Sequence, residues 1–389
     1  MPNFHAKNFI EPVYPSSYGK SNFEFVAHSN RGDRLVMSHL EDNDLLLQII
    51  KNKDSYLVKG DKITRPSQVA ILQQVLRDYR DLTNTIPTNS NIDSKKEKTL
   101  KVSPFLKTME YFANSFETSK DILVEVGFGS GRHLLHQAKK NPDKIVIGLE
   151  IHKPSIEQVL KQCTLQKIDN ILVVDYDART FLEFLSSNSV KQIFVHFPVP
   201  WDKKPHRRVI SKAFINESKR VLSKGGTLEL RTDSDNYFEY SFGEFINQEK
   251  VELHINKNKD LEISSKYEDR WKRQEKDIYD ITMTNKEISE EISKIGRLKF
   301  DKNIDFKELK NRFQEATLRG EGFFAHIENI FEINENEGLV RVSFGASQRN
   351  EHSYIYIKKD EVTYLPDNVL ATKDNEKAHN LIKEYIWNM

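Results

Sequence analysis

The chain has 389 residues, which is more than one domain usually contains, so we expect two or three folding units with a sizeable buried core. Lys and Arg number 59 against 58 Asp and Glu, a net charge of +1, which excludes a general electrostatic attraction to nucleic acid and leaves that role to local clusters. The single cysteine, Cys163, excludes an internal disulfide framework and a cysteine-rich metal site, which indicates a reducing compartment.

The N-terminus, "MPNFHAKNFIEPVYP", has neither the basic start nor the apolar core of an export signal. No apolar run in the sequence approaches the roughly 18 residues that a membrane helix requires. We therefore expect a cytoplasmic protein that does not enter a membrane.

Residues 1–82 are expected to form an N-terminal α+β extension, because the strand-like "SYLVKG" precedes the helical "SQVAILQQVLRDY". Residues 83–102 are polar, contain Pro87 and are rich in Asn, Ser and Lys, which is typical of a solvated linker. This linker is predicted to separate the N-terminal extension from the centre of the chain.

From Asp121 onward, short β-rich runs alternate with longer helical stretches such as "SKAFINESKRVL". The β-rich runs are "DILVEVG", "KIVIGLE", "NILVVD", "KQIFVHF" and "TLELRTD". This alternation predicts parallel βα units, and so a doubly wound α/β sheet within residues 103–285.

A glycine-rich loop follows the first of these runs. "VEVGFGSGRHLL" places Gly127, Gly129 and Gly131 between a buried strand and a helix, where backbone without side chains lets a ligand approach closely. A tight turn without a ligand is the alternative, since such short patterns are weak signals. The context favours a ligand, because acids stand beside the loop and after the next two strands. These acids are Glu125, Glu150 and Asp177.

The acid after the second strand is placed to hydrogen-bond ribose hydroxyls. A dinucleotide-binding dehydrogenase would share Glu150, but it needs a small residue where this chain has the bulky Arg132. The pattern resembles instead the cofactor site of class I S-adenosylmethionine-dependent methyltransferases. That resemblance implies that Glu150 holds the ribose and that Asp177, in preference to Asp175, lies near the adenine.

The stretch "FPVPWDKKPHRR" follows the fourth strand and should face the same crevice as the glycine loop. Pro198 and Pro200 fix the backbone, and Trp201 offers a flat surface for a base or a cofactor. The cations after them suit the phosphates of a nucleic acid, and the alternative is a solvated loop. These cations are Lys203, Lys204, Arg207 and Arg208.

Beyond about residue 285 the pattern changes. "DFKELKNRFQEATLRG" places Phe306, Leu309, Phe313 and Ala316 on one helical face, and "LVRVSFGA" and "SYIYIKK" are typical of a β-hairpin. Residues 286–389 are therefore expected to form a separate C-terminal α+β extension. Its "SYIYIKKDEVTYLP" loosely echoes "SYLVKGDKITRP" near the N-terminus, which we interpret as coincidence and not as an internal repeat.

The motifs together resemble one family. "EVGFGSG", "IGLEIHKPS", "DYDA", "FPVPWDKKPHRR", "KGGTLELRTD" and "SKYEDRW" occur in the order found in bacterial tRNA (guanine-N7-)-methyltransferases, over about residues 121–285. The resemblance implies a Rossmann-like class I methyltransferase fold, S-adenosylmethionine as methyl donor and tRNA as partner. It further implies transfer to N7 of the guanine at position 46, in the variable loop, to form 7-methylguanosine. We expect neither DNA nor a membrane as a partner, and we assign no protein partner.

The resemblance also implies roles for single residues. Glu125, Glu150 and Asp177 resemble the family's cofactor contacts, beside the glycines of the loop. The residues that resemble its substrate contacts are Lys203, Asp233, Ser265, Lys266 and Glu268. For Asp233, the alternative is an N-cap of the helix predicted after it.

Val199 departs from the family pattern. The family corner is usually F-P-D-P-W, and its aspartate is the residue most often proposed as catalytic, so the catalytic residue stays unassigned here. Guanine N7 carries a free lone pair, so its methylation requires in-line approach and no general base. A carboxylate near the cationic product ring would still help, and Asp202 and Asp233 are the candidates.

Two alternative functions stay open. The first is an S-adenosylmethionine-dependent methyltransferase of the same fold that acts on another substrate. The second is a non-catalytic tRNA-binding protein with a decayed site, which Val199 motivates. A metal site is not expected, because His133 and His136 lack a companion cluster of ligands in the sequence.

Overall fold

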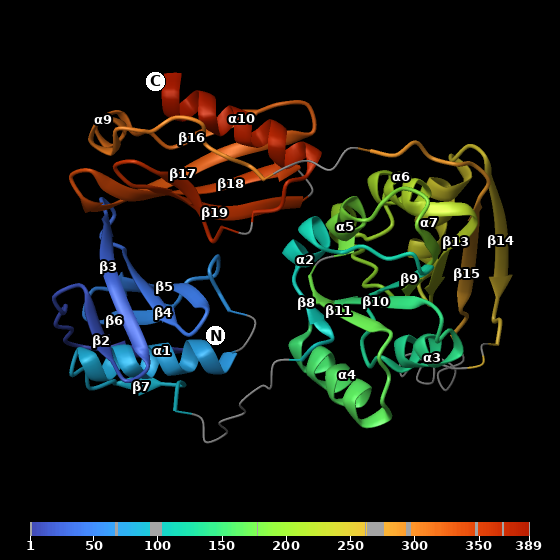
Figure 1. Cartoon of the computed structure of the whole chain (residues 1–389), viewed down its shortest axis with the longest axis horizontal. Coiled ribbons are helices and arrows are strands. Elements are labelled where there is room, and N and C mark those ends of the chain that lie inside the picture. Colours follow the sequence, from blue (N-terminus) through green and yellow to red (C-terminus); the bar gives the residue numbers. More distant parts are fainter. Residues whose placement is uncertain are drawn as a thin grey trace. The chain divides into compact units, whose positions relative to one another are not determined.

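The computed structural model describes residues 2–66, 69–93, 103–176, 178–260, 262, 276–292, 297–346, 349–367 and 369–388. The chain forms two compact units (Figure 1). The central unit comprises Val102–Lys294, and the flanking unit combines Met1–Lys101 with Ile295–Met389. Among the described residues, no helix has the length and apolar character needed to cross a membrane.

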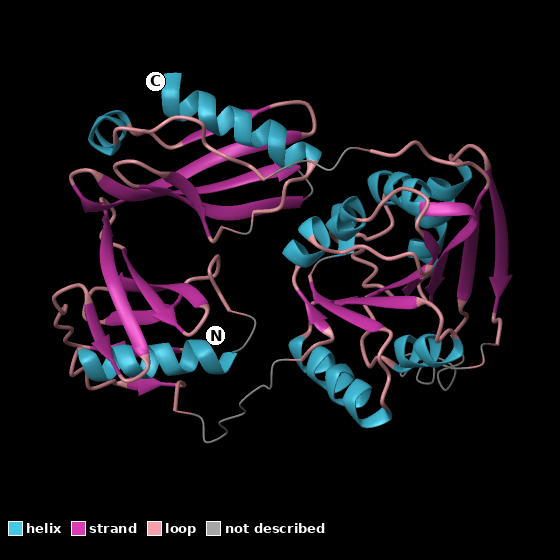
Figure 2. Cartoon of the chain, in the orientation of Figure 1, coloured by secondary structure: helices cyan, strands magenta, loops and turns pink. Residues whose placement is uncertain are grey.

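The central unit is a sheet with helices on both faces (Figure 2). Its strands are β8 (Leu106–Lys107), β9 (Ile122–Val126), β10 (Ile145–Glu150), β11 (Ile171–Asp175), β12 (Val190–His196), β13 (Leu222–Thr232), β14 (Val251–Lys257) and β15 (Tyr279–Asn285). Its α-helices are α2 (Met109–Asn114), α3 (Arg132–Lys140), α4 (Lys153–Gln166), α5 (Ala178–Phe181), α6 (Lys212–Val221) and α7 (Asp235–Ile246). The sheet order is β14-β15-β13-β12-β9-β10-β11-β8, and β15 runs antiparallel to both of its neighbours. The predicted doubly wound α/β fold is confirmed.

Local sequence explains these elements. Every residue of β9, "ILVEV", is buried, as expected for a parallel strand that is covered on both faces. Pro154 lies in the first turn of α4, where its missing N–H leaves no helical bond unmade. Ser234 caps α7 by accepting a hydrogen bond from the Tyr237 N–H.

The strand order places the predicted ligand loops side by side. From β9 the chain continues to β10 on one side, and it later returns to β12 on the other side of β9. Ligands of doubly wound sheets bind at such a switch point, beyond the carboxyl ends of the strands. Because Val126 pairs with Val195, the loops that follow β9 and β12 leave the sheet at the same level.

In the flanking unit, strands from the N-terminal and C-terminal parts of the chain form one sheet. Its strands are β1 (Asn3–Ala6), β2 (Ser16–Tyr18), β3 (Ser21–Ser29), β4 (Arg34–Leu40), β5 (Asn43–Lys51), β6 (Tyr56–Gly60), β7 (Asn89–Ser90), β16 (Ala316–Arg319), β17 (Phe323–Asn334), β18 (Glu337–Ala346), β19 (Arg349–Ile357) and β20 (Val362–Leu365). Its helices are α1 (Val69–Leu82), α9 (Phe306–Arg312) and α10 (Lys373–Asn388). The main path of the sheet is β20-β19-β18-β17-β3-β4-β5-β6-β1-β7.

The two extensions that the sequence predicted as separate are therefore joined. β17 pairs with β3, and Phe25 from the N-terminal part lies in one buried cluster with Phe331 from the C-terminal part. The Tyr354 hydroxyl donates to the buried Asp61 carboxylate at 3.0 Å. Local patterns could not indicate this union, because the paired strands are far apart in the sequence.

The predicted linker also differs from the structure at its N-terminal end. Within residues 83–93, strand β7 pairs with β1, and Ile92 is fully buried in the core beneath α1. This part of the polar stretch therefore belongs to the flanking unit. Residues 94–102 lie outside the described residues.

The order of elements recurs in the two parts of the flanking unit, which our interpretation of the echo as coincidence did not anticipate. β3 to β6 pair in sequence order and are followed by α1, and β17 to β20 do the same before α10. The first strands of the two series, β3 and β17, meet antiparallel at their junction. The echoing letters themselves do not correspond, because residues 55–66 contain one strand, whereas residues 353–366 contain the end of β19 and the whole of β20.

Candidate active site

The glycine loop, residues 127–131, has a backbone that favours glycine. Gly127, Gly129 and Gly131 all adopt positive φ, at 68°, 52° and 72°. A Cβ on Gly131 would lie 2.2 Å from Val159 Cγ2, so this glycine is required for packing of the loop against α4. A Cβ on Gly127 would meet nothing within 4 Å, so its backbone borders open space into which a ligand can fit.

Glu150 ends β10 and holds the glycine loop. One of its carboxylate oxygens accepts a hydrogen bond from the Gly129 N–H at 2.9 Å. The other accepts from the N–H groups of Ile151 at 2.8 Å and His152 at 2.9 Å. Glu150 is therefore bound to the loop and is not a free surface acid.

The acid that ends β11 is engaged differently from Glu150. Asp175 accepts a hydrogen bond from Lys153 Nζ at 2.5 Å, so this carboxylate is already engaged in an ion pair. Asp177, which the resemblance places near the adenine, lies outside the described residues.

Glu125 lies beneath the glycine loop. Its residue is 3% exposed, and its Oε2 is 2.9 Å from Nδ1 of His133, which belongs to the first turn of α3. Burial lowers the pKa of His133, but the charge and hydrogen bond of Glu125, together with the charge of Glu229, raise it by more, so the pKa lies above the ordinary value. The structure thus places the Glu125 carboxylate against α3, whereas the resemblance implied a cofactor contact.

The corner, residues 197–208, has an unusual backbone. Phe197 and Trp201 adopt positive φ, at 49° and 48°, which is rare for bulky residues and is typical of functional sites. The Phe197 N–H donates to the Arg231 carbonyl at 2.7 Å, and this bond fixes the start of the corner to β13.

Arg208 stabilises the corner from within. Its Nε donates to the Pro200 carbonyl at 2.7 Å, and its guanidinium lies 4.5 Å from the centre of the Tyr240 ring. The residue is only 7% exposed. The prediction that Arg208 contacts phosphates is therefore wrong, because its guanidinium is buried in the fold.

The other cations of the corner face solvent. Lys203, Lys204 and Arg207 are exposed, and none of the three forms a salt bridge with a described residue. The Arg207 guanidinium lies 5.2 Å from the centre of the Trp201 ring, which is 37% exposed. Val199 is 60% exposed, so the apolar side chain at this position is displayed on the surface.

The two acids considered as replacements for the family aspartate differ in setting. Asp202 is about half exposed and accepts a hydrogen bond from Arg208 at 3.3 Å. The Asp233 side chain is 20% exposed and accepts from Lys276 Nζ at 3.2 Å. Because Ser234 is the N-cap of α7, the alternative that Asp233 caps this helix is wrong.

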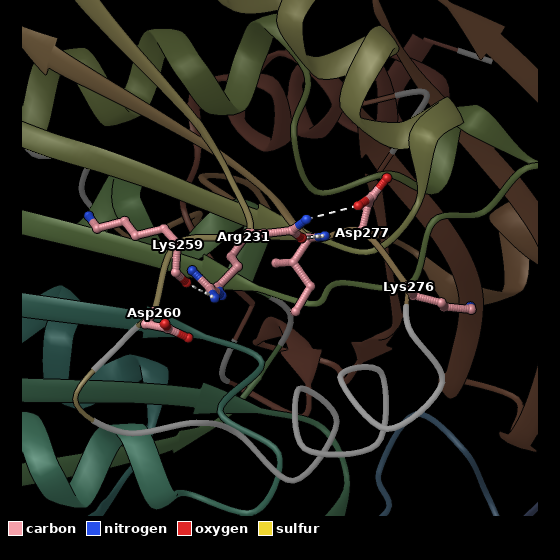
Figure 3. A pocket seen from close by; sticks show the side chains of 7 residues that line it. Arg231, Lys259, Asp260, Lys276 and Asp277 are labelled. Atoms are coloured by element: carbon pink, nitrogen blue, oxygen red, sulfur yellow. Dashed lines mark hydrogen bonds between the residues drawn. The ribbon is translucent and has the colours of Figure 1, made fainter.

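Figure 3 shows a pocket of about 260 Å³ that Lys276 helps to line. The same Lys276 donates to Asp233. It is lined by Arg231, Asn258, Lys259, Asp260, Lys276, Asp277 and Ile278. Sequence reasoning missed these residues, although Arg231 stands at the carboxyl end of a predicted strand, where ligand contacts gather. The predicted substrate residues Ser265, Lys266 and Glu268 lie outside the described residues.

Comparison with known proteins identifies the family. Residues 119–281 match the model of a family described as "Putative methyltransferase". The tRNA (guanine-N(7)-)-methyltransferase of Wolinella succinogenes is 40% identical, over 99% of this chain and 100% of its own length. The enzyme of the same name from Helicobacter pylori is 37% identical, over 99% of this chain and 98% of its own. The likeness spans the flanking unit as well as the central one, and the chain belongs to the tRNA (guanine-N7-)-methyltransferase family.

Proposed function

We propose that this protein transfers the methyl group of S-adenosylmethionine to N7 of a guanine in tRNA, and that the guanine is the one at position 46 of the variable loop. The observation that carries the proposal is the juxtaposition of two loops at the switch point of the sheet. One is the glycine loop held by Glu150, and the other is the rigid corner with its exposed cations. Membership of the family supports the choice of reaction and substrate.

The residues present fit S-adenosylmethionine. The Gly127 backbone borders open space, and the Glu150 carboxylate accepts three backbone N–H groups. A carboxylate offers about four acceptor sites, so Glu150 retains capacity for a ribose hydroxyl. When bound, the cofactor would supply an electrophilic methyl group on its sulfonium.

Positioning is the main task of the corner in this reaction. The lone pair of guanine N7 is free, so the protein has to align the base and hold the RNA. Lys203, Lys204 and Arg207 are available for phosphates, and the exposed Trp201 offers a ring for stacking. The apolar Val199 is compatible with this role, because no proton has to be removed.

Asp233 is the better candidate for stabilising the cationic product ring, because it is the less exposed of the two acids. We expect Asp233→Asn to lower kcat by about tenfold, since a well-placed charge contributes up to about 3 kcal/mol and positioning remains intact. Asp202→Asn should change kcat by less than about twofold, because solvent screens an exposed charge. Full turnover by Asp233→Asn, measured under saturating tRNA, would remove Asp233 from this role.

The test of the function is transfer of a labelled methyl group from S-adenosylmethionine to an unmodified tRNA transcript. A second transcript carries adenine in place of guanine 46, and nucleoside analysis identifies the product. We expect 7-methylguanosine from the first transcript only.

Other outcomes of this assay point to the alternatives. Labelling of a cell extract that resists ribonuclease would indicate another substrate. Equal labelling of both transcripts would refute position 46 alone. Binding of tRNA and cofactor without transfer would indicate a decayed site, and Val199→Asp would then be the variant to assay for restored activity.

A further inference from the structure

Two buried histidines meet beneath the candidate active site. His133 lies in the first turn of α3, and His196 is the last residue of β12. The centres of their rings are 4.6 Å apart, and the His133 ring also packs edge-on against Phe194 at 4.7 Å. These two residues, the histidine couple, bring the start of a helix into contact with the end of a neighbouring strand.

Each histidine of the couple also contacts one carboxylate. His133 Nδ1 lies 2.9 Å from Glu125 Oε2, and His196 Nε2 lies 2.8 Å from Glu229 Oε1. All four side chains are largely buried, with exposed fractions of 10% for His133, 5% for Glu125, 8% for His196 and 19% for Glu229. The result is one buried chain of side chains that extends across β9, β12 and β13.

The couple connects the two loops of the candidate site. His133 comes two residues after Gly131, the last residue of the glycine loop, and His196 directly precedes Phe197, the first residue of the corner. Phe197 has the strained positive φ that needs support from its surroundings. A shift of either loop would therefore move one ring of the couple against the ring that adjoins the other loop.

We propose that His133 and His196 are paired positioning residues that couple the glycine loop to the corner, so that binding at one loop fixes the other. This inference rests on the proposed function for the identity of the ligands, but the mechanical link follows from the contacts alone.

The charges around the couple favour a proton on His133. Cross-strand pairing places Glu125, Glu229, Arg231 and Asp280 on the same face of the sheet, so three carboxylates face one guanidinium. Burial raises the pKa of Glu229, but the hydrogen bond and charge of His196, together with Lys259 and His133, lower it by more, so the pKa lies below the ordinary value. A proton on His133 reduces this buried negative surplus, in agreement with its raised pKa. The groups that face the couple are Glu125 on β9, Gln137 on α3, Glu229 and Arg231 on β13, Lys259 after β14, and Asp280 on β15.

The sign of the pH dependence follows from the direction of this shift. Because the folded state raises the pKa of His133, the charged contact is complete below the ordinary pKa of histidine and is lost as the pH rises through the raised value. Gln137 Nε2 lies 3.0 Å from His133 Nε2, an arrangement that suits the neutral ring, so loss of the proton leaves a weaker neutral network in place. Coupling should therefore weaken with rising pH without collapse of the fold.

The experiment measures calorimetric binding of S-adenosylhomocysteine, which requires no RNA and no turnover. His196→Phe keeps a ring but removes the nitrogen that binds Glu229, and it changes a residue outside the glycine loop. We expect its affinity for S-adenosylhomocysteine to fall by about tenfold. His196→Gln, which can donate an amide N–H to Glu229, should recover most of that loss at neutral pH.

Three further variants complete the design. His254→Gln is the matched control, because His254 and Glu252 form a comparable contact of 2.8 Å that is exposed, and its affinity should equal that of the wild type. The double variant of His133→Phe and His196→Phe should lose less than the product of the single losses, by about threefold or more. His133→Asn, which keeps a donor for Glu125 but cannot hold the proton, should flatten the decline of affinity as the pH rises above the ordinary pKa of histidine, about 6.5.

Several outcomes would overturn the inference. Wild-type affinity in folded His196→Phe, multiplicative losses in the double variant, or an unchanged pH profile in His133→Asn would each do so. If His196→Phe does not fold, the pH profiles of His133→Asn and His196→Gln decide the matter. Intact coupling without methylation of tRNA would refute the proposed function alone, and methylation without coupling would refute this inference alone.

Discussion

Replacing Glu150 with alanine should weaken the binding of S-adenosylmethionine by about a hundredfold. The carboxylate accepts three backbone hydrogen bonds, one of them from Gly129 in the middle of the glycine loop. Its removal leaves these N–H groups without their charged acceptor, and it also removes the proposed acceptor for the ribose. Hydrogen bonds to a charged group contribute about 1.5–3 kcal/mol each, so a loss of about 3 kcal/mol, or a hundredfold, is expected.

Calorimetric titration with the cofactor measures this effect, and circular dichroism checks the fold. Glu150→Gln should give a smaller loss, about tenfold, because the amide keeps one acceptor oxygen but turns an NH₂ group toward a backbone N–H. Asp143→Asn, an exposed acid in the turn between α3 and β10, is the control and should bind like the wild type. Binding by Glu150→Ala within twofold of the wild type would show that the carboxylate contributes neither a ribose contact nor a loop conformation that the cofactor needs.

The parts of the fold that were predictable from sequence are those with local signals. The apolar run of β9 and the glycines after it identify a strand and a ligand loop within a dozen residues. The pairing of β3 with β17 has no such signal, because two segments separated by the whole central unit create it. The sequence patterns, taken in chain order, therefore predicted two separate extensions, whereas the structure has one flanking unit.

Within the site, residue type was predictable but side-chain direction was not. Arg208 looked like one more cation of a surface run, yet its guanidinium is buried and donates to the Pro200 carbonyl. His133 was considered only as an unsupported metal ligand, since its true partners, Glu125 and His196, come from two different strands. Direction of this kind depends on backbone dihedral angles and on neighbours that sequence does not place.

Arg231→Met should lower the free energy of unfolding of the central unit by about 3–5 kcal/mol, the usual effect of breaking a buried ion pair from one side. Arg231 is fully buried, and its guanidinium donates to Asp280 Oδ1 at 2.6 Å and to the Lys259 carbonyl at 2.7 Å. Methionine fills a similar volume but leaves the buried Asp280 carboxylate without its charged partner. Urea unfolding measures the change, and hydrogen exchange assigns it to the central unit.

A second ion pair, which is exposed, serves as the control that distinguishes loss of the buried pair from loss of any cation. Lys257 and Asp277 lie 2.6 Å apart but are about half exposed, so Lys257→Met should leave the urea midpoint unchanged. Adding Asp280→Asn to Arg231→Met should restore a large part of the stability, because the unpaired charge is gone.

Burial already raises the pKa of Asp280, and loss of the guanidinium raises it further, so the defect of Arg231→Met should shrink as the pH falls and Asp280 takes up a proton. If Arg231→Met instead unfolds like the wild type at every pH, then the desolvation of the pair cancels its attraction. The role of Arg231 would then be confined to its backbone, whose carbonyl holds Phe197 at the start of the corner.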